Sequence, residues 1–233
     1  MQSDYKFDIS MRPDYSLLTM NLEPGQKVYA EPGSMASMST GIELKAGLKG
    51  GIMKSLGRAL GGENLVINTY TAKKHGEVTF APGPMGDLQH YRLDGNSLIL
   101  QKGGFVAHGE GVDLSAKWEG AKGFFSGEGL VLLKASGTGD VFFSTYGAII
   151  EVDVSEGYLV DTGYVVAFED TLNYSVTVVP GLGTGSKIKS FLFGGERLVC
   201  KFQGRGRVWI QTRCVTPFLR WAYSYRPRER SSN

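Results

Sequence analysis

Three copies of one short motif divide this chain into related units. The first copy, residues 61–66 (GGENLV), recurs as residues 126–131 (SGEGLV) and again as residues 194–199 (GGERLV), at offsets of 65 and 68 residues. A second, looser motif precedes each copy in the same order, at residues 33–44, 103–114 and 163–174. A unit of ~60 residues buries little core by itself, so we expect the three units to pack against one another.

Alternation of apolar and polar side chains indicates β-strands. Residues 5–11 and 18–22 both follow this period-two pattern, and turn residues return every 8 to 12 positions along a chain with 33 glycines. The pattern predicts an all-β fold. We expect three related β-sandwich-like units about a pseudo-threefold axis, within a single domain of residues 1–225; the units lie at about residues 25–82, 95–147 and 156–213.

Each copy of the motif predicts a β-hairpin, made of an apolar strand, a turn and a second strand. The predicted turns all contain glycine, which accepts a positive φ, and they comprise residues 74–77, 137–140 and 204–207. Residues 94–96 (DGN) predict one more tight hairpin turn.

The glycine and the glutamate of the motif are candidates for a repeated structural role. The glutamates could form a ligand set, but acids in three separate units lie too far apart to share a catalytic site. We expect each glutamate to accept backbone N–H bonds, and Gly127 and Gly195 to need a positive φ or a close backbone approach. The residues are Gly62, Glu63, Gly127, Glu128, Gly195 and Glu196.

A short amphipathic helix is predicted in the first unit, over residues 47–62. Ile52, Leu56 and Leu60 recur four residues apart, and glycine bounds both ends. The helix could cap the open end of a β unit, or its basic side chains could contact a membrane surface or a partner. Those basic side chains are Lys49, Lys54 and Arg58.

Positive charge gathers at the end of the chain. Residues 217–233 hold four arginines and one acid, a net charge of +3, whereas the rest of the chain carries −1. We expect residues 226–233 to form a solvated basic tail. The aromatic residues before it are expected to pack in an alternating terminal strand, although with Arg220 and Arg226 they could also stack on bases; they are Phe218, Trp221, Tyr223 and Tyr225.

No pattern of reactive residues indicates an enzyme. His75, His90 and His108 are scattered and are expected in turns or at the surface, while Cys200 and Cys214 lack the spacing of a zinc site and are expected to be buried or half-buried thiols. We therefore expect no metal and no cofactor. No apolar run approaches the ~20 residues of a membrane span, and the amino terminus shows no signal peptide, so we expect a cytoplasmic protein.

Two segments carry a resemblance to a known family. Residues 59–70 (ALGGENLVINTY) and 194–212 (GGERLVCKFQGRGRVWIQT) resemble the mitochondrial-biogenesis, "altered inheritance of mitochondria" family, whose members are largely uncharacterised. The resemblance covers roughly residues 5 to 225. It implies a fold similar to that of the trp RNA-binding attenuation protein, with three β units in one chain, and a homotrimer. It implies no catalytic residues.

The sequence thus favours a non-enzymatic, oligomeric β scaffold that binds a protein partner, a membrane-associated assembly or a small ligand. The alternative is a nucleic-acid or anion-binding module that uses the basic tail and the helix with Lys49, Lys54 and Arg58. The near-neutral body of the chain argues against nucleic acid, because such binders cluster Lys and Arg over one face.

The proposed role of the motif glycines is testable by substitution. We expect Gly195→Val to lower the free energy of unfolding by ~1 kcal/mol or more, because a β-branched side chain resists a positive φ. Thermal unfolding measures the effect. A midpoint equal to that of the parent protein would refute the proposed turn.

Overall fold

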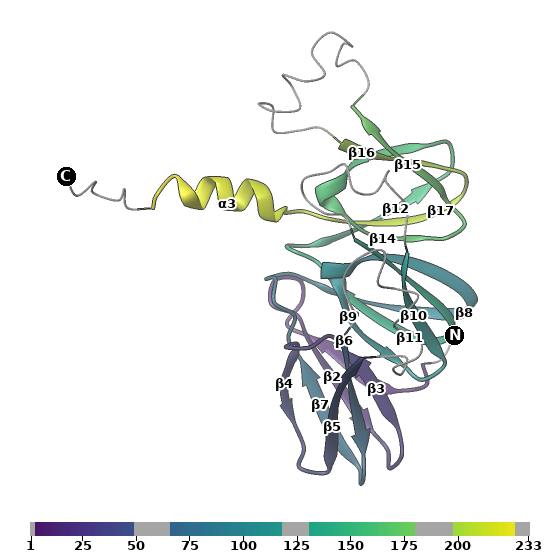
Figure 1. Ribbon diagram of the computed structural model, residues 1–233, viewed down its shortest axis with the longest axis vertical. Helices are drawn as coiled ribbons and strands as arrows, with labels where there is room; N and C mark the ends of the chain where they lie inside the picture. Colours follow the sequence, from purple (N-terminus) through teal and green to yellow (C-terminus); the bar gives the residue numbers. More distant parts are fainter. Residues whose placement is uncertain (1–2, 49–65, 118–130, 180–197, 227–233) are drawn as a thin grey trace, which may run out of the picture.

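Strands make up nearly all the regular structure of the chain in its computed structural model (Figure 1). The structure describes residues 3–48, 66–117, 131–179 and 198–226. Within these ranges the all-β prediction is confirmed, and one α-helix and two single-turn 3₁₀ helices complete the architecture.

The first unit consists of two antiparallel layers of three strands each. One layer has the order β2-β7-β4 and the other β3-β6-β5. Alternating exposure along β2 and β3 matches the alternating sequence, since one face of each strand is buried. The strands are β2 (Leu17–Leu22), β3 (Lys27–Ala30), β4 (Met35–Met38), β5 (Ile42–Leu48), β6 (Val66–Ala72) and β7 (Gly76–Phe80).

The same pairing pattern recurs in the third unit and, with fused strands, in the second. The third unit has layers β12-β17-β14 and β13-β16-β15. In the second unit, β8 and β11 each run through both layers and pair along their whole length, with β9 beside one half of β11 and β10 beside the other. Their bounds are β8 (Leu88–Gln101), β9 (Phe105–Gly109), β10 (Val112–Lys117), β11 (Leu132–Ser144), β12 (Ile149–Val154), β13 (Tyr158–Asp161), β14 (Val165–Glu169), β15 (Asn173–Val178), β16 (Leu198–Gln203) and β17 (Gly206–Gln211).

An irregularity in the strand register recurs with the units. In β4 the pairing with β7 skips one residue between Met35 and Ser37. In β9 and in β14 the pairing skips at the same position, between Phe105 and Ala107 and between Val165 and Ala167. A bulge re-aims the strand, and this one recurs within the looser sequence motif that precedes the Gly-Glu motif.

Neighbouring units are joined by one kind of strand pairing. Strand β3 of the first unit pairs with β9 of the second, and the second half of β8 pairs in the same way with β14 of the third. At the centre of these junctions Tyr29 faces His108, and Ile99 faces Phe168. Each junction therefore joins the second strand of one unit to the third strand of the next.

Several strands lie at sheet edges, and two of them, β4 and β13, are a third strand and a second strand of the kinds that form the junctions. Among the described strands, β4 pairs only with β7 and β13 only with β16. Figure 1 shows the first unit at one end of the molecule and the third at the other. Strands β4 of the first unit and β13 of the third do not pair with each other, so this type of strand pairing does not close the three units into the ring that a pseudo-threefold axis would require.

The hydrophobic core crosses the unit boundaries. The cluster centred on the first unit includes Phe142 of the second, and the cluster of the second includes Trp209 of the third. In turn, Ile99 of the second unit packs into the cluster of the third. Shared clusters make the stability of each unit depend on its neighbour.

The hairpin predictions need correction. Strands β6 and β7 lie in different layers, as do β16 and β17, so the turns between them are corners rather than hairpins. Residues 137–140 lie inside the continuous strand β11, and residues 94–96 lie inside β8. Gly95 and Gly137 have φ of +78° and +107°. The glycines let a strand bend from one layer into the other where turns were expected.

The two ends of the described chain lie outside the repeats. Strand β1 (Lys6–Ser10) extends the first unit by pairing with β2. The predicted terminal strand over residues 218–225 is wrong, because helix α3 (Val215–Tyr223) occupies most of it. Val215, Phe218, Leu219 and Ala222 follow helical spacing, and Pro217 falls in the first turn, where its missing N–H is tolerated.

The predicted helix at residues 47–62 falls mostly outside the described residues. Its first two residues, Gly47 and Leu48, end strand β5 and pair with Ile67 and Val66, which contradicts a helix start there. Of the basic tail, only Arg226 is described, and it is exposed. Cys200 is buried and Cys214 half-buried, as predicted.

Phe168 tests the packing at the junction of the last two units. Its ring is 1% exposed and lies 4.8 Å and 5.0 Å from the rings of Tyr174 and Phe202. We expect Phe168→Ala to cost about 3–5 kcal/mol of stability, because it leaves a cavity. Val178→Ala, at an exposed position, should stay within about 0.5 kcal/mol. Similar denaturant midpoints for the two variants would contradict the core assignment.

Candidate functional site

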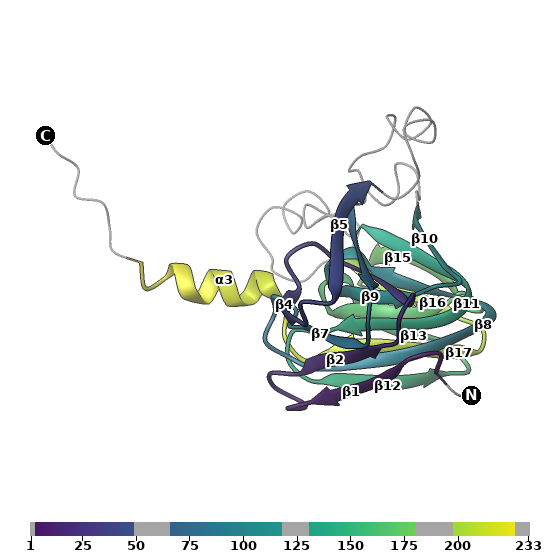
Figure 2. The same ribbon diagram turned by 90° about the horizontal axis from the view of Figure 1, so that it is seen from below.

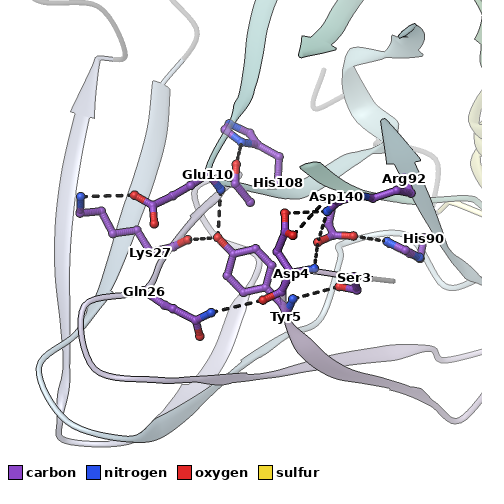
Figure 3. Close-up of polar contacts among 11 residues, drawn as sticks. Ser3, Asp4, Tyr5, Gln26, Lys27, His90, Arg92, His108, Glu110 and Asp140 are labelled. Atoms are coloured by element: carbon purple, nitrogen blue, oxygen red, sulfur yellow. Dashed lines mark hydrogen bonds and ion pairs between the residues drawn. The ribbon is translucent and has the colours of Figure 1, made fainter. Parts of the chain in front are cut away.

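A buried carboxylate stands at the centre of a polar cluster between the second unit and the amino-terminal segment. Figure 3 shows Asp140, on β11, with side chains from β8 and the amino-terminal segment around it. Its side chain is fully buried. His90 Nε2 lies 2.7 Å from Oδ1, while Arg92 Nη1 and the backbone N–H of Asp4 donate to Oδ2 at 3.1 Å and 2.9 Å. Strand pairing positions the cluster, since His90 and Arg92 face Phe142 and Asp140 across β8 and β11.

The surroundings of Asp140 hold it in its ionised form. Burial alone would raise the pKa of this carboxyl, but the hydrogen bonds from His90, Asp4 and Ser3 outweigh it, and the pKa is lowered. Arg92 connects Asp140 to the side chain of Asp4, because it also donates to both carboxylate oxygens of Asp4, at 2.6 Å and 3.1 Å. The cluster thus ties the amino-terminal segment to the second unit.

His90 is held between two aromatic rings and the buried carboxylate. Its ring lies between Phe7 and Phe142, with centroids 4.7 Å and 5.1 Å away. A histidine paired with a carboxylate can transfer protons, but here Nε2 faces the buried carboxylate and the ring is flanked by aromatic side chains. This geometry suits a structural anchor that joins β1 to β8 and β11.

Tyr5, next to Asp4 in the chain, joins the first two units. Its hydroxyl donates to the carbonyl of Lys27 at 2.6 Å and accepts from the backbone N–H of Glu110 at 2.9 Å. These two residues belong to different units, at the start of β3 and just after β9. Burial raises the pKa of Tyr5 to about 12, so the hydroxyl keeps its proton.

The second junction carries a polar cluster built from different residues. Arg207 Nε and Nη2 donate to Oε1 of Glu169 at 3.0 Å and 2.8 Å, and Tyr91 donates to the same oxygen at 3.0 Å. Trp209 Nε1 donates to Glu151 at 2.8 Å. The Arg207 guanidinium also lies 5.0 Å from the Trp209 ring, a cation–π contact. This cluster links Tyr91 of the second unit to the third.

The free edges of β4 and β13 differ from their counterparts in the junctions. Every residue of β9 is buried, and so is most of β14, whereas β4 is mostly exposed. Met38 is 38% exposed and Leu159 is 45% exposed. The residues at equivalent places in the two junctions, His108 and Phe168 on the third strands, are almost fully buried. The two edges therefore present apolar side chains that a junction would cover.

Comparisons with known proteins agree with this architecture. The family described as mitochondrial biogenesis AIM24 matches residues 7–213. The chain belongs to the AIM24 family. It is 26% identical over 240 residues to an uncharacterised protein, M6_Spy0233, from Streptococcus pyogenes, with 95% of this chain and 91% of that protein covered. The crystal structure of SPYM3_0169 from Streptococcus pyogenes is similar in fold, with a TM-score of 0.78 at 23% identity over 95% of this chain and all of the other.

The motif residues predicted from the sequence of this AIM24-family chain lie outside the described residues. This applies to Gly62, Glu63, Gly127, Glu128, Gly195 and Glu196, and to Lys49, Lys54 and Arg58. Helix and site assignments at those positions stay predictions.

The histidines are partly corrected by the structure. His75 is exposed, as predicted, but His108 is fully buried and stacks on Tyr29 at 4.9 Å between ring centroids. In the ranges that the structure describes, no group of three or more His, Cys, Asp or Glu side chains could hold a metal ion, and no helix is long and apolar enough to span a membrane. Sequence reasoning missed the Asp140 cluster, in which Asp4 and Asp140 are 136 residues apart in the chain.

Asp140→Asn should weaken the link between the amino-terminal segment and the second unit of this AIM24-family chain. We expect a loss of about 2 kcal/mol in the free energy of unfolding, because hydrogen bonds to a charged group are replaced by weaker ones. The pKa of Asp140 is lower in the folded state. Its contribution is therefore complete above the pKa of the unfolded chain and is lost as the pH falls through the folded value.

Denaturant titrations between pH 7 and the acid range measure this effect. The difference between the parent protein and Asp140→Asn should shrink as the pH falls. Asp153→Asn, at an exposed carboxylate on β12, is the matched control and should change stability little at any pH. A pH-independent difference between Asp140→Asn and the parent would contradict the ionised, stabilising role of Asp140.

Proposed function

We propose that this AIM24-family chain is a non-enzymatic, cytoplasmic scaffold that assembles with copies of itself, strand β13 of one copy pairing with strand β4 of the next. One observation carries the proposal. The chain makes the same junction twice, between β3 and β9 and between β8 and β14, and it leaves one further strand of each type at its two ends.

The equivalence of the strands defines the register of the proposed contact. Ala30 pairs with Ala107 in the first junction, and Leu100 pairs with Ala167 in the second. The buried position on β13 is Val160, and the residue after the bulge on β4 is Ser37. The proposed register therefore pairs Val160 with Ser37 and Leu159 with Met38.

The chemistry of the two edges supports this register. Met38 and Leu159 would take the places of the central pairs Tyr29–His108 and Ile99–Phe168. Both are large apolar side chains that are well exposed in the single chain. Pairing would bury them and satisfy the backbone N–H and C=O groups along both edges.

A contact between two different edges joins copies head to tail. Such a contact closes into a ring if the rotation between copies allows it, and otherwise continues as a filament. We propose closure as a homotrimer, in which the β units lie side by side as in the trp RNA-binding attenuation protein. The family resemblance motivates both of these details.

The use of the buried ionisable groups supports a non-enzymatic role. Asp140, Tyr5 and Glu169 each make at least one hydrogen bond to a residue of a neighbouring unit or of the amino-terminal segment. Groups held in this way join parts of the scaffold.

The proposed contact between β13 of one copy and β4 of the next, called the seam below, is tested by the mass of the assembly. Light scattering after size exclusion should give about three times the 25.3 kDa of one chain. Met38→Lys alone and Leu159→Glu alone should each release single chains, because each places an unpaired charge in an apolar contact.

A double variant separates the seam from general damage. Met38→Lys combined with Leu159→Glu places opposite charges face to face in every seam and should restore the assembled mass. Ile150→Lys, at an exposed apolar position on β12, is the control and should leave the mass unchanged. A parent protein with the mass of one chain at micromolar concentration, or single variants that stay assembled, would overturn the proposal.

A further inference from the structure

Helix α3 is an exposed, strongly apolar element. None of its residues is buried, and it stands away from the strands in both views of the molecule (Figures 1 and 2). Val215, Phe218 and Leu219 are 51%, 41% and 40% exposed, and with Ala222 they form one apolar stripe at helical spacing. An isolated helix of nine residues is marginal in water, so a stripe of this kind is suited to a partner surface.

The base of the helix is fixed to Tyr146, in the segment between β11 and β12. The backbone N–H of Arg213 donates to the carbonyl of Tyr146 at 3.1 Å, and the rings of Phe218 and Tyr146 meet edge to face at 6.0 Å. These contacts leave the rest of α3 projecting outward from the end of β17.

Basic side chains and amphipathic aromatic side chains surround the stripe. Trp221, Tyr223 and Tyr225 are 60% to 73% exposed, and the Arg226 guanidinium lies 5.8 Å from the Tyr223 ring. Arg213 and Arg220 add two more charges, and residues 213–226 contain no acid. Tryptophan and tyrosine favour the boundary between lipid headgroups and acyl chains, and arginine binds phosphate in a bidentate manner.

We propose that α3 docks on the surface of a bilayer containing anionic lipids, with its apolar stripe among the acyl chains and its arginines at the lipid phosphates. Charge complementarity selects this occupant, because a surface that accepts Arg213, Arg220 and Arg226 together must be negatively charged. The exposed rings of Trp221 and Tyr223 match the interfacial depth that such a helix occupies.

A single short helix gives weak attachment, and the inference therefore rests on the proposed assembly for its strength. Copies related by cyclic symmetry place their α3 helices in equivalent positions. Once one helix has docked, the others are held at a high local concentration near the membrane. The assembled protein should then bind vesicles much more tightly than a single chain does.

Vesicle flotation tests the docking on the full-length protein. We expect binding to vesicles of phosphatidylcholine with about a third of phosphatidylglycerol, little binding to phosphatidylcholine alone, and loss of binding in high salt. Leu219→Glu should weaken binding at least about tenfold, as should Arg220→Glu combined with Arg226→Glu. Ile150→Glu, at an exposed apolar position on β12, is the matched control and should bind like the parent.

The mass of each variant separates this inference from the proposed assembly. Leu219→Glu should keep the assembled mass while losing vesicle binding, whereas Leu159→Glu should lose the mass and keep weak, lipid-dependent binding. Failure of an intact assembly to bind anionic vesicles, equal binding to both kinds of vesicle, or undiminished binding by Leu219→Glu would overturn membrane docking. Release of single chains by Leu219→Glu would instead show that the apolar stripe of α3 contacts another copy of the chain. That result would also overturn membrane docking.

Discussion

Strand pairing between units is the interaction on which the rest of this structure depends. Backbone hydrogen bonds from β3 to β9 and from β8 to β14 bring the units into contact, and only then can their side chains share a core. Phe142, Trp209 and Ile99 each pack into a cluster centred on another unit. The bulge repeated in β4, β9 and β14 keeps the pairing residues in equivalent positions from unit to unit.

Polar clusters then distinguish the junctions from one another. The first junction buries Asp140 under the amino-terminal segment, and the second holds Arg207 against Glu169 and Trp209. A buried carboxylate is costly unless its oxygens are well satisfied, so Asp140 stabilises the fold only while His90, Arg92 and Asp4 are all in place. Similar backbone contacts combined with different side chains direct each unit to its own neighbour.

The sequence predicted the fold class and the family, because both depend on patterns that recur along the chain. It failed at residues 94–96 and 137–140, where glycines that usually mark a turn bend a continuous strand instead. It also failed at α3, since aromatic residues spaced by two and by three fit a strand and a helix about equally well. The Asp140 cluster could not be predicted, because Asp4, His90 and Asp140 meet only through long-range pairing.

The repeated junction has a consequence for how such proteins change through evolution. Each unit can pair its second strand with the following unit and its third strand with the preceding one, so it carries both strand edges that a junction needs. Duplicating or deleting a whole unit preserves both of these strand edges, whereas changing the strand order inside a unit destroys them. Chains of different lengths can therefore arise from one gene segment without a new interface, and the point mutations that matter most are those that make one junction unlike the next.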